Sequence, residues 1–516
     1  MNKPNLSWGI YLLLGVTLLS PAARALELRL TGQNEARYAR GRQPGSLDAN
    51  YHYFENYLEL DAGLDPLRLH LRQSYRLPSE YGRRSSGLDA FDKRYIEYAK
   101  DDVLLRGGNF YRTWGRGLLL GVIEVLELNF DSGLDGLLME VSQGDWEASA
   151  FRGVEADSAG EFREQGEGFR LSKRLPMGIR LGAAAVHLDK GPRHPDLNRT
   201  GGELEKEFDQ GSLFLAYVAD KLDRDVDRYH NAFYGAGSIY GDGWALFGEY
   251  HNYRLFTYRD PGQPSGFADQ PSLQYPPTGS PESTMHLLDR HPRLSHFNDE
   301  TGLQVEANFN REDWTLLMNY SQSSEQDKDG VIPRLKEEYS PYRGVFAHLE
   351  RNPYEGDRLA LQGGWQEDVE FTATSAGGYS VWFQRVAAGG IYERRLDDSW
   401  TLAGDLQVLK VIDRSRDYHF WEDFLGVTLT RSPWGSLTAM IERSLNRSEV
   451  GGLDWVGDDG AGMRYWPSVE TTLKIKDNHQ VRLFVGHERG GLRCSGGVCR
   501  FVNPFKGVKL TVTSQF

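Results

Sequence analysis

The sequence predicts an all-β protein that crosses a membrane as one antiparallel β-barrel of about 22 strands, within a range of roughly 20 to 24. Three observations support this fold class. Apolar and polar residues alternate along most of the chain, the last residue, Phe516, ends the apolar face of a strand, and the first residues form an export signal. Alternation alone would also suit a soluble β-sandwich, because any strand with one buried face alternates. The two ends of the chain therefore decide between these classes.

The final strand places apolar residues at alternate positions on one face: Val508, Leu510, Val512 and Phe516. This ending resembles that of Gram-negative outer-membrane β-barrels, whose last strand commonly ends in Phe after alternating apolar residues. Ser514 departs from the pattern, because an apolar residue is more usual there. The resemblance implies an outer-membrane location, contact with lipid and lipopolysaccharide, and recognition of this terminal signal by the barrel-assembly machinery. It identifies a class of protein and no transported substrate.

The chain is predicted to begin with a secretory signal peptide, Met1–Ala25. Lys3 supplies the positive charge, Ile10–Leu19 the apolar core, and Ala23-Arg24-Ala25 the small-residue cleavage site. The barrel domain is then expected to comprise residues 26–516. Cleavage removes Lys3 and Arg24 and changes the net charge from −14 to −16. An acidic chain argues against nucleic-acid binding, which requires a basic surface.

The composition fits a barrel better than a helical membrane protein. No other segment offers the roughly 20 consecutive apolar residues that a transmembrane helix needs. The mean hydropathy of −0.54 is expected for a barrel, because only alternate strand residues face lipid. The 26 Tyr, 24 Phe and 12 Trp residues recur near strand ends, where they would form girdles at the membrane interfaces.

Short turns and long loops alternate, which is the layout of a barrel with brief periplasmic turns and longer external loops. The predicted short turns are Asp65-Pro66, Gly144-Asp145, Pro176-Met177-Gly178, Gly241-Asp242-Gly243, Asn310–Asp313, Asn352–Asp357, Asp397-Asp398-Ser399, Ser432-Pro433-Trp434 and Asp477-Asn478-His479. The predicted long loops are Pro78–Asp92, Val154–Glu164, Asp189–Glu207, Thr257–Glu300, Glu325–Glu338 and Asn446–Gly462. One stretch stays open: Gly211–Ala219 either pairs with Val226–His230 in an external hairpin or belongs to a loop.

A second unusual segment follows Gly107-Gly108-Asn109-Phe110, where the glycines allow close backbone approach. The string from Gly108 to Leu118 is similar to one in an uncharacterised family of bacterial outer-membrane proteins, which implies no activity. Tyr111–Gly133 fits neither strand alternation nor a clean helix pattern. We expect it either to fold into the barrel mouth and narrow the lumen, or to form an ordinary strand and loop. The candidate constriction residues are Tyr111, Arg112, Trp114 and Arg116.

Inward positions of the predicted strands carry charges of both signs: Arg385, Glu393, Arg395, Asp405, Glu470, Lys474, Arg482 and Glu488. Charges that line a lumen can select which solutes pass a pore. They can equally be ion pairs that any polar interior requires. Only a cluster at a constriction would form a selectivity filter.

Cys494 and Cys499 are predicted to form a disulfide across the last surface loop, because an exported chain meets an oxidising periplasm. A redox or haem site is the alternative, but the sequence contains no Cys-x-x-Cys-His motif. The acidic cluster Asp220, Asp223, Asp225 and Asp227 lacks the glycine and closing glutamate of an EF-hand loop. His286, His291 and His296, with Asp289, match no known ligand spacing. We therefore expect no metal site and no cofactor.

These features predict an outer-membrane channel for a hydrophilic solute or an exported polymer. One alternative is a barrel scaffold that holds a periplasmic or surface partner, such as a multihaem cytochrome. A hydrolase sited at the barrel rim is the other, but no Gly-x-Ser-x-Gly signature supports a catalytic residue. We therefore do not expect an enzyme. A plugged transporter is disfavoured because strand alternation starts at Leu26, Leu28 and Leu30.

Overall fold

The computed structural model describes residues 28–42, 50–78, 87–126, 130–156, 162–189, 195–223, 229–258, 270–279, 284–293, 295–326, 330–374, 377–415, 417–446, 465–495 and 498–516. The predicted signal peptide lies outside these residues. Among them, no helix has the length and apolarity needed to cross a membrane.

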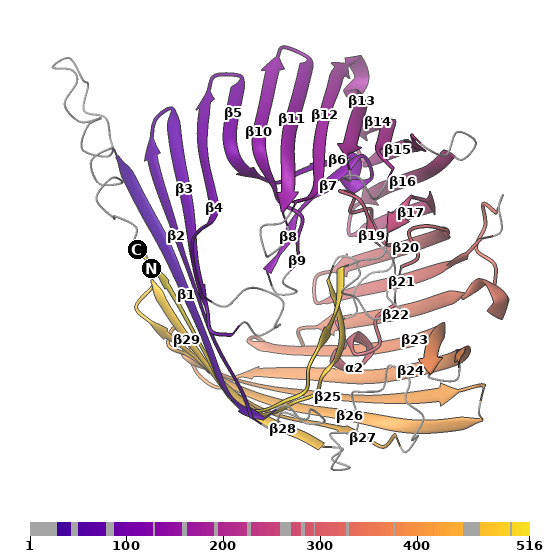
Figure 1. The fold of residues 1–516 in the computed structure, drawn as a ribbon. Coiled ribbons are helices and arrows are strands. Elements are labelled where there is room, and N and C mark those ends of the chain that lie inside the picture. Colours follow the sequence, from indigo (N-terminus) through magenta and orange to yellow (C-terminus); the bar gives the residue numbers. More distant parts are fainter. Residues whose placement is uncertain are drawn as a thin grey trace.

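A closed antiparallel sheet of 24 strands forms the wall (Figure 1). Closure is direct, because the first strand pairs with both the second and the last. The wall strands are β1 (Arg29–Arg42), β2 (Tyr51–Leu64), β3 (Leu67–Arg76), β4 (Gly87–Lys100), β5 (Val103–Phe110), β10 (Leu134–Gln143), β11 (Trp146–Ala156), β12 (Phe162–Leu175), β13 (Ile179–Asp189), β14 (Leu197–Phe208), β15 (Gly211–Leu222), β16 (Tyr229–Gly241), β17 (Trp244–Arg254), β20 (Glu300–Arg311), β21 (Trp314–Glu325), β22 (Tyr342–Arg351), β23 (Asp357–Thr374), β24 (Gly377–Arg395), β25 (Trp400–Asp413), β26 (Tyr418–Arg431), β27 (Gly435–Ser444), β28 (Tyr465–Ile475), β29 (His479–Glu488) and β32 (Phe505–Gln515).

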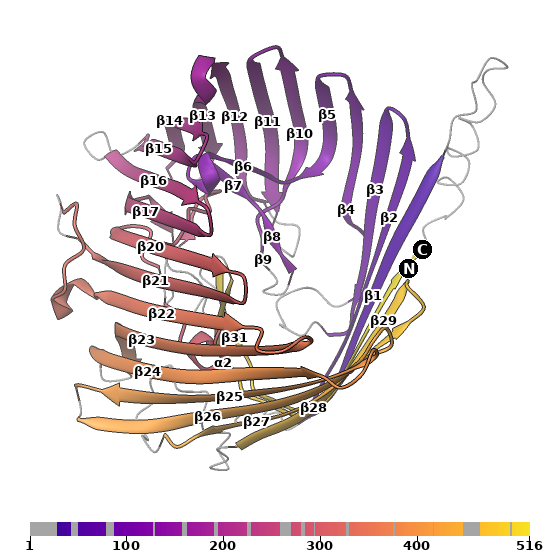
Figure 2. The ribbon, with the colours of Figure 1, turned by 180° about the vertical axis from the view of Figure 1, so that it is seen from behind.

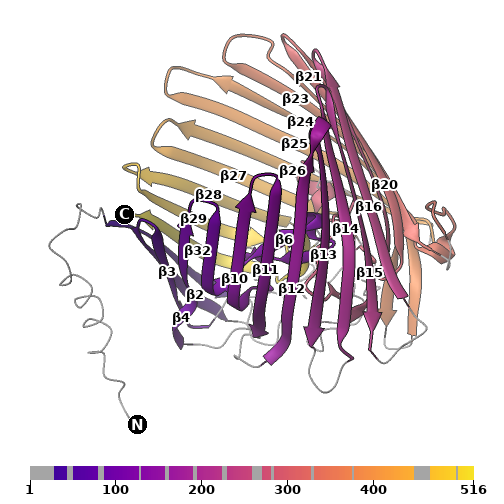
Figure 3. The same cartoon turned by 90° about the horizontal axis from the view of Figure 1, so that it is seen from above.

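The remaining elements are short and lie in the connections. They are β6 (Arg112–Trp114), η2 (Gly115–Gly117), β7 (Leu120–Val122), β8 (Glu124–Val125), β9 (Phe130–Asp131), η4 (Pro176–Gly178), β18 (Thr257–Tyr258), β19 (Gln270–Pro271), α2 (His286–Asp289), η5 (Glu337–Tyr339), β30 (Gly491–Ser495) and β31 (Val498–Val502). Wall strands follow one another in chain order, and Figure 3 shows β10 to β15 side by side.

The strand number is at the top of the predicted range rather than at the favoured 22, and β14 and β15 account for the difference. The prediction of a loop at Asp189–Glu207 was wrong, because most of this stretch belongs to the wall strand Leu197–Phe208. Neither alternative for Gly211–Ala219 holds, since β15 pairs along its length with β14 and β16. The outward positions of β14 include Asn198, Thr200 and Gly202, so the strand lacks the apolar alternation that marks its neighbours.

The two faces of the wall differ as alternation predicts. On β25, Leu402 and Leu406 are exposed, whereas Gln407 and Leu409 are buried. The buried pair contacts α2 inside the ring, so the exposed pair faces outward. All nine predicted short turns join adjacent wall strands. Four strands begin with Trp directly after such a turn, which gives this rim a girdle of aromatic residues: Trp146, Trp244, Trp314 and Trp400.

The C-terminal strand closes the barrel against β1. Val508 and Val512 share its outward face, and Thr511 and Thr513 share its inward face. At the end of the seam, the backbone of Phe516 exchanges hydrogen bonds with Gly32 at 2.8 and 3.0 Å. The Phe516 ring lies over Gly32, where a side chain would displace it.

Candidate functional site in the barrel interior

Three connections fold inside the ring of wall strands instead of leaving it (Figures 1 and 2). The first insert, residues 111–133, carries β6 to β9 and joins β5 to β10. The second insert, between β17 and β20, carries α2, and the third insert, between β29 and β32, is the hairpin β30–β31. All three start from the ends of wall strands opposite the short turns. The interior near those ends is therefore occupied by the chain itself.

The first insert packs tightly against the inner wall. Leu118, Leu119 and Leu120 are fully buried in one apolar cluster with inward side chains of β13 to β16. Gly201 on β14 permits this approach, because a Cβ there would lie 2.5 Å from Leu119 Cδ2. The second insert adds Leu273 to the same cluster, and its Tyr275 N–H donates to the Gly117 carbonyl at 2.9 Å. Apolar burial, the main stabilising term in folding, thus fixes both inserts to this wall.

A buried ion pair anchors the same region. Arg199 Nε donates to Asp220 Oδ1 at 2.9 Å, and neither side chain has exposed surface. The same guanidinium donates to the Ser272 carbonyl at 3.1 Å and to the Leu119 carbonyl at 3.5 Å. Arg199 therefore connects the wall to both inserts.

The four candidate constriction residues all lie in the first insert, but they point to different partners. The Tyr111 hydroxyl donates to Asp131 at 3.2 Å, and burial, with the Asp131 carboxylate alongside, raises the pKa of Tyr111. Arg112 forms an ion pair with Glu140 of β10 at 2.5 Å. Trp114 is buried edge-to-face against Phe151, and the Arg116 guanidinium stacks on the Phe214 ring at 4.3 Å. Tyr111 is thus bonded within the insert, whereas the other three contact the wall, and the four do not form one ring of charge.

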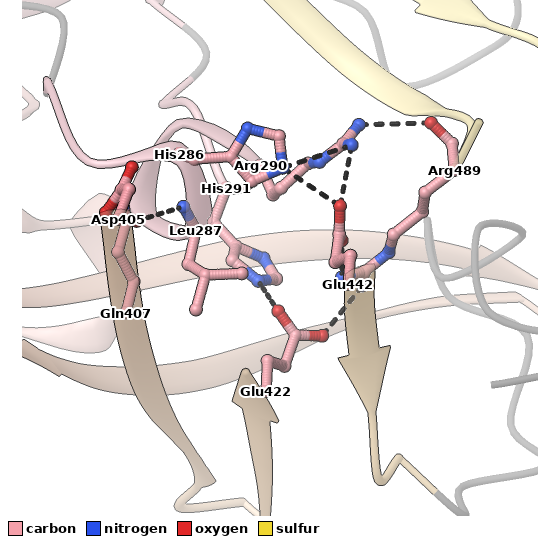
Figure 4. Close-up of polar contacts among 9 residues, drawn as sticks. All are labelled: His286, Leu287, Arg290, His291, Asp405, Gln407, Glu422, Glu442 and Arg489. Carbon is pink, nitrogen blue, oxygen red and sulfur yellow. Dashed lines mark hydrogen bonds and ion pairs between the residues drawn. The ribbon is translucent and has the colours of Figure 1, made fainter. Parts of the chain in front are cut away.

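The second and third inserts meet the wall at two buried carboxylates, Glu422 of β26 and Glu442 of β27 (Figure 4). Arg489, at the base of hairpin β30–β31, donates to both of them at 2.7 Å. Arg290, which follows α2, donates to Glu442 at 2.8 Å and to the Arg489 carbonyl at 3.0 Å. His291 contacts Glu422 at 3.3 Å. We call these five residues, with His286, the latch.

His286 completes the latch at 3.0 Å from Glu442. The opposite side of α2 is apolar: Met285, Leu287 and Leu288 are buried against β24 to β26. The Leu287 N–H donates to Gln407 at 3.1 Å, so the start of the helix is also bound to the wall.

Electrostatic attraction holds the latch together. Burial disfavours the charged guanidinium of Arg489, but the carboxylates of Glu422 and Glu442 outweigh burial and raise its pKa above the usual value. Arg489 therefore stays charged, and its charge is balanced only while both carboxylates remain beside it. Separation of either partner would leave an unpaired charge away from water, which is strongly unfavourable.

The predicted lumen charges lie at inward positions but are dispersed around the barrel. Glu470 and Arg482 approach each other at 3.9 Å. The others pair with residues that sequence reasoning did not select: Arg385 with Asp368, Glu393 with Arg358, Arg395 with Asp398, Asp405 with Gln407, and Glu488 with Lys509. The Lys474 side chain is exposed.

Charged pairs instead follow the rim of short turns. Arg174 and Arg180 contact Glu147 at 2.6 and 3.7 Å, and Arg358 contacts Glu350 at 2.9 Å. Their side chains are between 24% and 65% exposed. We call this inward band near the short turns the vestibule. Sequence reasoning missed it because each member is one charge in an otherwise ordinary alternation.

The remaining candidate sites have separate partners. Asp220 belongs to the buried ion pair, Asp223 accepts from Asn198 at 2.7 Å, and Asp225 and Asp227 lie outside the described residues. His286 and His291 belong to the latch, whereas His296 contacts Glu325 at 3.5 Å. Within the described ranges, no group of three or more His, Cys, Asp or Glu residues is placed to hold a metal ion. The backbone sets Cys494 opposite Cys499 in hairpin β30–β31, and the disulfide stays a prediction.

The closed sheet, its apolar outward positions and its polar vestibule together decide the class. The chain is a closed antiparallel β-barrel with an apolar outer face. A family of unknown function, DUF6029, matches residues 462–516, which span β28 to β32. No curated protein matches the chain in sequence.

Several solved structures are similar to this barrel. One is the P pilus usher (PapC) translocation pore, with 12% identity, a TM-score of 0.46, and coverage of 95% of this chain and 99% of that chain. The siderophore receptor PirA from Pseudomonas aeruginosa has 12% identity, a TM-score of 0.44, and coverage of 95% and 80%. OccAB3 of Acinetobacter baumannii has 11% identity, a TM-score of 0.36, and coverage of 95% and 99%. The assignment as a barrel rests on this chain's own strand pairing.

Proposed function

We propose that this protein is a gated channel in the Gram-negative outer membrane, through which a hydrophilic solute or an exported polymer passes. The observation that carries the proposal is a change in the interior along the barrel axis. Near the short turns, the inward side chains are charged and partly exposed. Near the long connections, three inserts lie in the interior (Figure 1) and are held by buried ion pairs.

The width of the barrel supports a gate rather than a permanently open pore. Barrels of 16 to 18 strands leave an aqueous channel, and barrels of 22 strands hold a plug in the lumen. A wall of 24 strands would be wide without its inserts. The first insert would narrow this lumen, and the second and third inserts would form the movable part.

The latch is the point at which the gate would open. It joins both movable inserts to neighbouring strands through Glu422 and Glu442. A permeating ion or charged polymer that competes for Arg290 or Arg489 would release both inserts together. The vestibule, with charges of both signs, would hold a hydrated solute without binding it strongly.

The proposed location follows from the same features. Signal cleavage after Ala25 would deliver the chain to the periplasm, and the assembly machinery would recognise its C-terminal strand. The short turns would then face the periplasm, and the inserts would enter from the external side.

Recordings in planar lipid bilayers test the proposal. We expect wild-type protein to show brief openings and the Arg489→Ala variant to show longer ones, because the latter lacks the guanidinium shared by the two carboxylates. The Arg94→Ala variant is a matched control, since Arg94 forms an exposed pair with Asp135 on the outer face. Folded protein without conductance in any variant would refute the channel. Co-purification of a periplasmic protein in that case would instead support a scaffold.

A further inference from the structure

The outer face of the wall carries an unusual polar patch. On β17, β20 and β21, outward positions near the long connections are occupied by polar residues: Tyr250, Asn252, Thr301, Gln322 and Ser324. Positions on the same face nearer the short turns are apolar and exposed, such as Val305 and Met318. Polar groups facing hydrocarbon are unfavourable unless they are hydrogen-bonded.

A segment of the connection between β21 and β22 covers this patch. Residues 330–335, which we call the strap, lie across the outer face of the barrel. The Tyr250 hydroxyl donates to the Val331 carbonyl at 2.7 Å, and Asn252 Nδ2 donates to the Gly330 carbonyl at 3.1 Å. Gln322 Nε2 donates to the Pro333 carbonyl at 3.4 Å. The polar wall side chains thus bind the irregular backbone of the strap.

The wall also supplies an acceptor for an N–H group of the strap. The Arg334 N–H donates to Ser324 Oγ at 2.8 Å. Ser324 and Thr301 have no exposed surface, although both point outward from the wall. Pro333, which has no N–H to satisfy, is buried against the barrel. Three carbonyls and one N–H of the strap are therefore bonded inward, to polar side chains of the wall.

The side chains that the strap presents to the outside are apolar. Val331 is 61% exposed, Ile332 71% and Leu335 43%. The charged residue between them, Arg334, is also exposed; it donates to the Tyr339 hydroxyl at 2.7 Å and stacks on that ring at 4.8 Å. Three charged residues follow the strap directly in the chain: Lys336, Glu337 and Glu338.

The height of the strap along the barrel axis falls within the apolar band expected of a membrane barrel. Tyr250 lies six residues above Trp244, the interface residue that starts β17. At about 3.3 Å per residue and a strand tilt of about 40°, it lies about 15 Å above that girdle. The apolar band of such barrels is about 25 Å tall. Val331 is hydrogen-bonded to Tyr250 and is therefore within the height of the band, on its outer side.

We propose that the strap is embedded in the outer leaflet, with Val331, Ile332 and Leu335 in contact with lipid acyl chains. Irregular backbone is excluded from hydrocarbon because its polar groups lack partners. Here the wall supplies partners for three carbonyls and one N–H, which explains why polar side chains occupy an outward face. The strap and the lipid-facing wall residues beside it then form one continuous apolar surface.

Spin labelling of the full-length protein in lipid vesicles tests this inference. A nitroxide at Ile332→Cys is compared with one at Leu406→Cys, which is exposed on the wall, and one at Tyr354→Cys, which is exposed in a short turn. Cys494→Ser and Cys499→Ser are included in each variant, so that only one site is labelled. Collision rates with oxygen, which concentrates in lipid, and with a water-soluble nickel chelate are then measured.

We expect the Ile332 label to match the Leu406 label, with high oxygen and low nickel accessibility. A match to the Tyr354 label would place the strap in water and overturn the proposal. Shielding from both reagents would show a protein partner or a second copy at this surface, and would also overturn it. The Tyr250→Phe and Asn252→Ala double variant should shift the Ile332 label toward water, since two strap carbonyls lose their donors.

Discussion

Arg199 and Asp220 lie opposite each other on β14 and β15 and form an ion pair that has no contact with solvent. Arg199 also binds carbonyl groups of the first and second inserts. This one pair therefore links the register of two wall strands to the position of the segments that fill the barrel. Its loss should affect the inserts and the wall together.

The Asp220→Ala variant tests that link. It leaves the Arg199 guanidinium buried without its carboxylate, and removal of one partner from a buried pair costs about 3–5 kcal/mol. We expect a loss of that order in the free energy of unfolding, measured by urea titration in detergent. Arg152→Ala is the control, because its pair with Glu167 is largely exposed and should contribute about 0–1 kcal/mol. Equal losses in the two variants would contradict the anchoring role.

The latch should protect the second insert from proteolysis. The Arg489→Ala variant loses charge-assisted hydrogen bonds to Glu422 and Glu442, each worth about 1.5–3 kcal/mol. We expect trypsin to cleave after Arg290 at least about tenfold faster, because 1.4 kcal/mol corresponds to a factor of ten. Mass spectrometry of the fragments measures the rate, with Arg414→Ala as control at an exposed site. An unchanged rate would show that Arg489 does not help to hold α2.

Substitutions on the two faces of the C-terminal hairpin should differ sharply. Val485 is 46% exposed on the outward face, so Val485→Lys should cost about 2–4 kcal/mol if it meets lipid near the midplane. Leu483→Lys should behave in the same way. Folding titrations into lipid vesicles measure both values.

The control for that comparison is an inward residue. Thr511 lies between Arg37 and Arg482, whose charges would repel an added lysine. Thr513 is the better choice, since it lies opposite Glu35. Thr513→Lys should change stability by less than about 1 kcal/mol. Comparable losses at 485 and 513 would mean that the faces are wrongly assigned.

Deletion of Phe516 should impair assembly in the cell more than folding in detergent. Its backbone exchanges two hydrogen bonds with Gly32, at the end of a seam that β1 and β32 form along their length. Without this residue, the other residue pairs between β1 and β32 can still form, so the purified barrel should still close. Fractionation of membranes and heat-shift electrophoresis measure the two effects. Normal membrane insertion of the truncated chain would count against a terminal signal.

The disulfide prediction has a direct check. Cys494 and Cys499 are opposite each other in hairpin β30–β31, a position from which a disulfide can form. We expect neither thiol to react with an alkylating reagent before reduction and both to react after it. Intact mass measures the number of added groups. Two groups added to the protein before reduction would disprove the bond.

The sequence by itself determined the barrel class, the positions of the short turns and the outward faces of most strands. Alternation reports which side of a strand meets lipid, and that property belongs to each strand alone. It failed at β14, where Asn198, Thr200 and Gly202 occupy outward positions. It also could not choose between the two expectations for Tyr111–Gly133, because glycine and leucine there suit several structures.

Only the tertiary structure decided which inward charges meet. Arg489 is 67 residues from Glu422 and 47 from Glu442, and no local pattern relates them. Their contact depends on strand register, on closure of the ring and on the path of the inserts. The strap on the outer face could not be predicted from the sequence for the same reason, because the hydrogen-bonded residues Tyr250 and Val331 are 81 residues apart. Side-chain alternation fixes a direction for each residue, but the partner it meets is set by how the whole barrel closes.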